Sequence, residues 1–277
     1  MSLRSVPLLA AVLWLSSCAR APEPVPQAPK PIEVRVVVVS MFEIGNDSGD
    51  TPAEFQLWHE RQKLDQRFAF PHHHDLYFNP ATGVLGMVTG MGNINSASAV
   101  MLLANDPRFD LSKAYWLVAG IAGVDPEDAS IGSAAWAEYL VDGDLAHEID
   151  AREIPRDWST GYFALDTRQP YDLNRRPSRG EVFHLNPGIV AWAYDKTKDI
   201  ALPDSEALAR ERSLYKGYAN AQKPPFVLRG DNLACMTFWH GKVLNEWANR
   251  WVGYWTDGKG RFVTSAMEDT GSFSSVN

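Results

Sequence analysis

The chain has 277 residues, of which 45% are hydrophobic and 22% are charged, the proportions of an ordinary globular protein with a full core. Its 26 basic and 34 acidic residues give a formal net charge of −8. This balance excludes a general nucleic-acid binder, because no surplus of Lys and Arg is available to neutralise phosphate groups.

The N-terminal residues are typical of an export signal. Arg4 precedes an apolar run, Pro7 to Leu15, that is too short to span a membrane as a helix. Residues 15–18, Leu-Ser-Ser-Cys, resemble a bacterial lipobox, in which Cys18 is lipidated. Such a lipid anchor would hold the protein at a membrane without a spanning helix. The alternative is a plain secretory signal cut near Ala19 or Ala21.

We therefore divide the chain into a lipoprotein signal peptide at 1–18, a proline-rich linker at 19–31 and one domain at 32–277. The expected location is the periplasmic face of the bacterial envelope, or a secreted or periplasmic one under the alternative. Cys235 is the single cysteine of the domain, which indicates a buried core thiol. No segment of the domain reaches the roughly 18 consecutive apolar residues of a membrane span.

The first part of the domain alternates predicted strands and helices. Glu33–Ser40 is β-branched and continuous, as in a buried central strand, and Pro52–Phe68 has helical spacing. A strand at Val84–Val88 then meets a Thr-Gly-x-Gly turn and a predicted helix near 95–105. The N–H groups at such a helix start can receive an anion or sugar hydroxyls. The glycine spacing differs from the dinucleotide-binding fingerprint.

The rest of the domain continues this alternation, with one irregular region. We interpret about 150–225 as an insertion or elaborated loop region with one helix near 204–218. The other predicted elements are strands at 114–119, 131–141, 226–231 and 261–265 and a Trp-rich helix at 242–255. The alternation predicts an α/β fold, a three-layer α/β/α sandwich with a mainly parallel or mixed sheet. In such sheets ligands collect at the carboxyl ends of the strands.

Glycine- and acid-containing loops follow the predicted strands, and together they resemble a known superfamily. The loops are Ser40-Met-Phe-Glu43, Thr89-Gly-Met-Gly-Asn93, Ala119-Gly-Ile-Ala-Gly123 and Ser265-Ala-Met-Glu268, with Arg229-Gly-Asp231 before the last. In this order and spacing they are similar to the nucleoside phosphorylase and nucleosidase superfamily. The resemblance implies a phosphorylase/hydrolase-like mixed sheet.

Three further stretches are similar to the purine nucleoside permease family within that superfamily. They are Gly120–Pro126, Gly132–Tyr139 and Trp255–Phe262. The run Gly90–Ala97 also looks very like the corresponding loop of adenosylhomocysteine and methylthioadenosine nucleosidases. The resemblance implies that a purine nucleoside is the ligand.

The resemblance also implies roles for particular residues. Glu268 is similar to the glutamate that holds the ribose hydroxyls, and a carboxylate there would support the positive charge that develops as the glycosidic bond breaks. Glu43 lies close to the position of a carboxylate that polarises water. The ribose, phosphate or water side would be formed by Thr89, Gly90, Gly92, Asn93, Met267 and Arg229, and the base side by Ala119, Gly120, Ala122, Gly123, Asp231, Asn232 and Leu233.

No cofactor is implied, although phosphate could serve as a co-substrate. The loop after the first strand contains Glu43 and Asp47 but no arginine, and arginine suits phosphate through its fork-shaped guanidinium. Arg229 is the only basic residue in a matched motif, which favours water as the attacking group. We interpret the histidine-rich run Pro71–Asp75 as a polar loop near the ligand, and we predict no metal site.

The chain ends at Asn277, soon after Glu268, so we expect a truncated family member whose leaving-group acid is missing or comes from elsewhere. The first reading is purine nucleoside binding with N-glycosidic bond cleavage by a nucleosidase- or phosphorylase-like reaction. The alternative is a binding component of nucleoside uptake without catalysis, since a chain without a span forms no pathway alone. A third reading is an envelope scaffold without a ligand. By the resemblance we also expect a homo-oligomer.

Overall fold

The computed structural model describes residues 29–165, 167–170, 172, 182–236, 243–244 and 246, together with the backbone of 262–266. Pro31–Asn277 forms one compact unit, separate from Met1–Lys30. The signal peptide and Cys18 lie outside the described residues. Among those residues no helix is long and apolar enough to cross a membrane.

The first large sheet has five strands and contains the loops of interest. Its order is β3 (Gln66–Phe68), β4 (Leu76–Asn79), β5 (Val84–Val88), β2 (Val36–Ser40) and β7 (Tyr115–Val118). β5, β2 and β7 run parallel, whereas β3 and β4 are antiparallel to their neighbours. The carboxyl ends of three adjacent strands therefore meet at one edge of the sheet.

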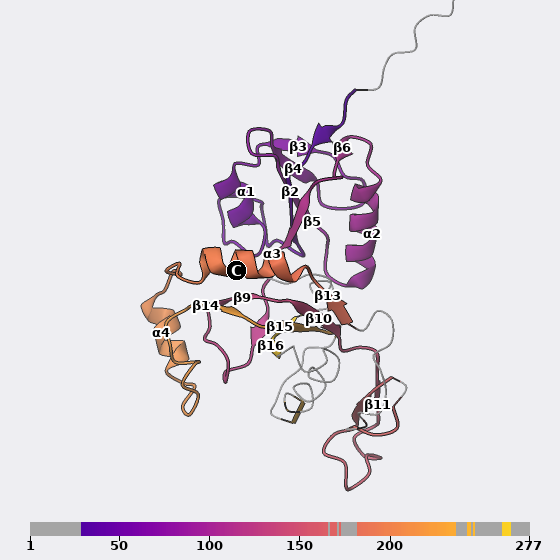
Figure 1. The fold of residues 1–277 in the computed structure, drawn as a ribbon, viewed down its shortest axis with the longest axis vertical. Helices are drawn as coiled ribbons and strands as arrows, with labels where there is room; N and C mark the ends of the chain where they lie inside the picture. The colour runs from indigo at the N-terminus through magenta and orange to yellow at the C-terminus, as the bar shows by residue number, and fades with distance from the viewer. Residues whose placement is uncertain are drawn as a thin grey trace, which may run out of the picture. The chain divides into compact units, whose positions relative to one another are not determined.

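Two helices cover opposite faces of this sheet, α1 (Gln56–Gln62) and α2 (Asn93–Ala104) (Figure 1). Side chains alternate along β5, because successive residues of a strand point to opposite faces. Leu85 and Met87 pack in the cluster that contains Ala99 and Leu103 of α2. Gly86 faces Phe55 and Leu64, at the two ends of α1. The predicted α/β class and layered arrangement are confirmed around this sheet.

The second large sheet is also mixed. Its order is β13 (Val182–His184), β10 (Tyr139–Asp142), β15 (Asp231–Ala234), β16 (Phe262–Ala266) and β8 (Gly123–Val124). β10, β15 and β16 run parallel, and β13 and β8 are antiparallel edge strands. Three further strand pairs are β1 (Ile32–Glu33) with β6 (Phe109–Asp110), β11 (Ala146–Glu148) with β12 (Tyr162–Ala164), and β9 (Ala134–Trp136) with β14 (Val227–Arg229).

Two helices lie between β13 and β14 in the sequence. α3 (Pro187–Thr197) contacts β9 and β14, and α4 (Glu206–Arg212) follows it. The α3 start is well specified, because Pro187 is the first helical residue and the Asn186 side chain accepts the N–H groups of Gly188 and Ile189. The sequence analysis missed α3, and its helix near 204–218 is the shorter α4.

Several predicted elements are wrong in extent. The strand predicted at Glu33–Ser40 is divided between β1 and β2, and the one predicted at 226–231 is divided between β14 and β15. The helix predicted at Pro52–Phe68 spans only Gln56–Gln62, because Lys63 adopts the left-handed conformation (φ 51°) and ends it. Phe68 belongs to β3 and pairs with Leu76 of β4. The strand predicted at 131–141 is two strands, β9 and β10, which belong to different sheets. The predicted Trp-rich helix at 242–255 lies mostly outside the described residues.

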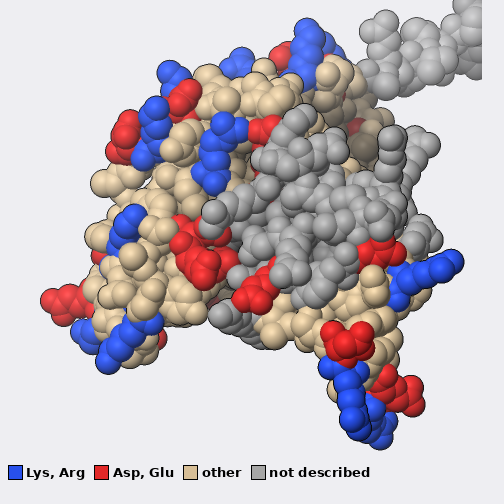
Figure 2. Space-filling model, turned by 60° about the horizontal axis from the view of Figure 1, so that its bottom comes forward, with Lys and Arg blue, Asp and Glu red and all other residues tan. Residues whose placement is uncertain are grey.

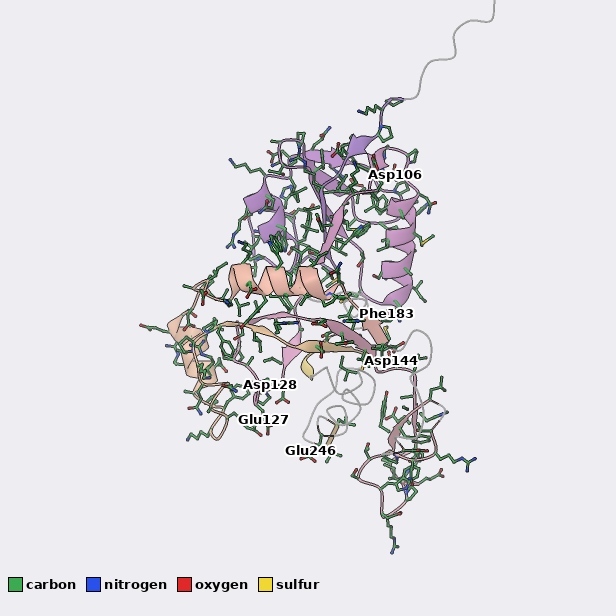
Figure 3. The ribbon with its side chains drawn as sticks, in the orientation of Figure 1. Asp106, Glu127, Asp128, Asp144, Phe183 and Glu246 are labelled. Carbon is green, nitrogen blue, oxygen red and sulfur yellow. The ribbon has the colours of Figure 1, made fainter. Side chains whose placement is uncertain are left out.

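On the described part of the face in Figure 2, Lys and Arg side chains lie next to Asp and Glu side chains in small groups. Ion pairs of the described residues include Arg67 with Asp75 and Arg108 with Asp106. Asp106, labelled in Figure 3, lies just beyond α2 and close to β6. The charges are locally balanced at these positions.

Candidate functional site

Three loops converge at the carboxyl edge of β5, β2 and β7. The Thr89 N–H donates to the Ser40 carbonyl at 2.9 Å, and the Ala119 N–H donates to the Val39 carbonyl at 2.9 Å. These bonds extend the parallel pairing by one residue on each side of β2. Because of them, the predicted loops that begin at Ser40, Thr89 and Ala119 start at the same level.

The turn between β5 and α2 depends on glycine. Gly90 has φ +84° and Gly92 has φ +92°, a region that residues with a Cβ rarely adopt. Thr89 is buried, and its hydroxyl donates to the Gly90 carbonyl at 3.0 Å. Gly92 precedes the first residue of α2, Asn93, and gives the helix no side-chain cap. The predicted order of strand, glycine turn and helix is therefore confirmed, with Thr89–Gly92 forming the turn between β5 and α2.

The second sheet meets this turn at the end of β15. A Cβ placed on Gly92 would lie 3.6 Å from the Met236 methyl carbon, so the Met236 side chain lies close to the turn. The Met236 N–H donates to Asp144, which follows β10 (Figure 3). Met236 was not singled out in the sequence, because no motif marks a methionine as a neighbour of a distant glycine turn.

The loop after β7 joins the two sheets. Val118 ends β7, and Gly123 begins β8, where it pairs with Ser265 of β16. Ser265 also pairs with Leu233 of β15. The predicted base-side residues Ala119, Gly120, Ala122 and Gly123 thus lead directly to the strand that precedes Met267 and Glu268. Those last two residues lie outside the described residues.

Glu43 has a clear structural role. Its carboxylate accepts the N–H groups of Ile44 and Ala53 on Oε1 and those of Phe55 and Gln56 on Oε2, at 2.5–2.9 Å. A carboxylate has about four lone-pair positions, so these donors occupy its full capacity. The negative charge also lies at the start of α1, where the helix dipole favours it. To polarise a water molecule, Glu43 would have to release one of these donors.

Glu54 is a second carboxylate at this edge, and the sequence analysis missed it. Its side chain is buried and accepts the Met41 N–H at 2.8 Å and the Ile121 N–H at 2.7 Å. Both donors belong to predicted site loops, one after β2 and the other after β7. No local pattern could reveal this residue, because its partners are 13 and 67 positions away in the sequence.

Asp231, Asn232 and Leu233 lie inside β15 and are all buried. The Asp231 carboxylate accepts the Tyr139 N–H at 2.8 Å, which holds the start of β10 next to β15. These residues, predicted on the base side, are therefore strand residues with packing partners in the second sheet. Their role toward a ligand stays a prediction.

Arg229 ends β14, before β15 begins, whereas Met236 follows β15. Its guanidinium pairs with the Glu138 carboxylate, whose other oxygen is 3.0 Å from His184 Nε2. The predicted phosphate-side cation is thus engaged in an ion pair at the opposite end of β15 from the contact with Gly92. The structure does not bring Arg229 to the glycine turn.

The histidine-rich run separates its side chains. His74 Nε2 lies 2.7 Å from Asp47 Oδ1, and His73 Nε2 lies 3.3 Å from the Ser98 hydroxyl on α2. Burial, followed by a hydrogen bond with the Asp47 carboxylate, raises the pKa of Tyr77 to about 12. Within the described residues, no three His, Cys, Asp or Glu side chains converge as metal ligands would.

Fold and site together define an α/β protein that presents its loops at the carboxyl ends of parallel strands, the usual position of a small-molecule site in this class. The model of a family described as purine nucleoside permease (NUP) matches residues 33–277. The chain therefore belongs to the purine nucleoside permease family, as its motifs indicated.

Two relatives carry the name of this family. A probable purine nucleoside permease of Schizosaccharomyces pombe is 30% identical over 210 residues, which cover 73% of this chain and 60% of that protein. The purine nucleoside permease of Candida albicans is 32% identical over 206 residues, covering 72% of this chain and 50% of that protein. The chain thus spans between half and three-fifths of the length of these relatives.

Among solved structures, a 5′-methylthioadenosine/S-adenosylhomocysteine nucleosidase from S. pneumoniae is similar at 15% identity, with 86% of this chain and 77% of that one covered and a TM-score of 0.43. Futalosine hydrolase of Helicobacter pylori is similar at 13% identity, with 86% and 80% covered and a TM-score of 0.47.

Proposed function

We propose that this protein binds a purine nucleoside at the carboxyl edge of β5, β2 and β7. The observation that carries the proposal is the convergence of the glycine turn at 89–93 with the loop at 119–123, in a member of the purine nucleoside permease family. The turn is suited to the sugar, because helix-start N–H groups bind hydroxyl and anionic oxygens. The loop at 119–123 is suited to the flat face of the base, because it exposes the apolar Ile121 side chain.

The reaction proposed for this site is cleavage of the N-glycosidic bond. Water would add to the anomeric carbon as the carbon–nitrogen bond breaks. The base would leave with the bonding electron pair and gain a proton, while the water loses one. Glu268 would accept the ribose hydroxyls and stabilise the positive charge that develops on the sugar, and Glu43 would orient the water. Gly123 of the base-side loop pairs with Ser265, which comes three residues before Glu268 in the sequence.

A second candidate is nucleoside binding without cleavage, as in a binding component of uptake. The full occupation of the Glu43 carboxylate by main-chain donors favours it, because no lone pair is left for water in this arrangement. The engagement of Arg229 with Glu138 bears on the first candidate, where it favours water over phosphate as the attacking group.

The test is purine release from inosine and adenosine, with and without inorganic phosphate, beside a calorimetric titration with the same nucleosides. Protein beginning at Pro31 is suitable, because Pro31–Asn277 is a compact unit. Glu268→Gln is compared with Glu153→Gln, which changes an exposed carboxylate elsewhere. Release that is independent of phosphate and lost only in Glu268→Gln supports a nucleosidase. Binding without release supports the second candidate, and absence of both contradicts the proposal.

Location and assembly complete the proposal. Cys18 would be the lipid-modified residue of an exported protein, and labelling with a radioactive fatty acid that disappears in Cys18→Ala would support this. Incorporation of the label that persists in Cys18→Ala would contradict it. A homo-oligomer is proposed from the family resemblance, and light scattering would give its mass.

A further inference from the structure

We infer that Glu54 is a positioning residue of this site, and that its buried carboxylate sets the spacing between the loop after β2 and the loop after β7. The inference rests on the proposed function for the identity of the ligand. It concerns a residue outside every matched motif and assigns it no direct contact with substrate.

The geometry is that of a bridge between two loops. Oε2 accepts the Met41 N–H at 2.8 Å, and Oε1 accepts the Ile121 N–H at 2.7 Å. Met41 directly follows β2 and belongs to the predicted loop Ser40–Glu43. Ile121 is the middle residue of the predicted base-side loop. Each carboxylate oxygen is therefore bound to a different loop.

The environment makes this bridge rigid. Glu54 is 5% exposed, and a buried charge is tolerated only when hydrogen bonds replace its water. Bonds from N–H groups to a carboxylate are shorter and stronger than those to a neutral acceptor. The main chain of Glu54 is held as well, because the buried Ser40 hydroxyl donates to its carbonyl at 3.3 Å.

Glu43 provides the contrast within the same region. All four of its donors belong to the segment from Ile44 to Gln56, so it organises one loop and the start of α1. Glu54 instead spans two loops that are far apart in the sequence. A change at Glu54 therefore shifts one loop relative to the other. A shift of more than about 0.5 Å weakens the binding of a ligand that contacts both loops.

The experiment uses the full chain and three variants. In Glu54→Gln the amide nitrogen replaces one acceptor, so one loop N–H faces a donor. Glu54→Asp keeps the charge and both oxygens but is one methylene shorter, so it cannot reach both loops. Glu153→Gln is the control for removal of an exposed charge. Hydrogen exchange is followed without ligand in 41–44 and 119–123, and inosine and adenosine affinities are measured by calorimetry.

In both Glu54 variants we expect amide exchange in at least one of the two loops to be about tenfold faster, because that loop loses a buried hydrogen bond to Glu54. Exchange in β7 should be unchanged. We expect the nucleoside affinity to fall about tenfold in parallel. Unchanged exchange in the loops, or unchanged affinity despite faster exchange, would overturn the inference. If the wild-type protein binds neither nucleoside, the proposed function fails, and the exchange rates alone then decide whether Glu54 joins the loops.

Discussion

The two five-stranded sheets both contain three adjacent parallel strands, but they place their predicted ligand residues differently. In the first sheet Thr89–Asn93 and Ala119–Gly123 follow the strands. Met91, Ile121 and Gly123 of these loops are exposed, although Gly92 and Gly120 are buried. In the second sheet Asp231–Leu233 lie within β15 and are buried. A matched motif therefore has different consequences at a strand end, where a ligand can reach it, and inside a strand, where packing uses its side chains.

The largest expected effect tests this difference with one variant from each sheet. Leu233→Ala should lower the free energy of unfolding by about 2–5 kcal/mol, because it leaves a cavity at a residue that is 2% exposed. Ile121→Ala, at a residue that is 55% exposed, should change it by less than about 0.5 kcal/mol. Denaturant unfolding measures both. Equal effects would remove the distinction between the two sheets.

Smaller effects are expected from the helix caps of the two regions. Glu43→Ala should lower stability by about 1–2 kcal/mol, because the N–H groups of Ala53, Phe55 and Gln56 lose their acceptor at the start of α1. Ser205→Ala removes a single bond, to the Leu208 N–H of α4, and should cost about 0.5–1 kcal/mol. Thermal unfolding of the two variants gives the order, and a larger loss from Ser205→Ala would contradict it.

The local elements could be predicted from the sequence, but the contacts between distant residues could not. Val84–Val88 and the glycine turn are specified by neighbouring residues, so the strand, turn and helix were found with small errors at the ends. The break between β9 and β10 depends on Asp231, which binds the Tyr139 N–H from 92 positions away. Glu54 was missed for the same reason, since its importance comes from two loops that only the fold brings together.

Acid should weaken the first sheet in a defined direction. The main-chain N–H of Phe70 and then the Arg67 guanidinium hold the pKa of Asp75 below its usual 3.8, despite partial burial. A group with a lowered pKa stabilises the folded state above the pKa of its unfolded form, and this contribution is lost as the pH falls through the folded value. The wild type should therefore lose stability below about pH 4.

The matched variants for this prediction are Asp75→Asn and Asp65→Asn, the second of which removes an exposed carboxylate. The free energy of unfolding, measured from pH 6 to pH 2, should fall less steeply in Asp75→Asn than in the wild type. An unchanged slope in Asp75→Asn, or the same flattening in Asp65→Asn, would show that Asp75 does not carry the effect.

The smallest effect is expected at Arg229. Its pair with Glu138 is partly exposed, at 43% for the arginine side chain, so Arg229→Gln should cost less than about 1 kcal/mol of stability. This pair lies at the end of β15 away from Gly92, so added phosphate should change the nucleoside affinity of Arg229→Gln as it changes that of the wild type. A different effect of phosphate in Arg229→Gln would show that Arg229 takes part in the site.

The central claim is that a purine nucleoside binds where the loops after β2, β5 and β7 meet, and hydrogen exchange of the wild-type chain with and without saturating inosine or adenosine tests it most directly. The account predicts slower exchange in 41–44, 89–93 and 119–123, with the interior of β15 unchanged because it is already buried. Protection confined to other segments, or no protection at saturating nucleoside, would contradict it.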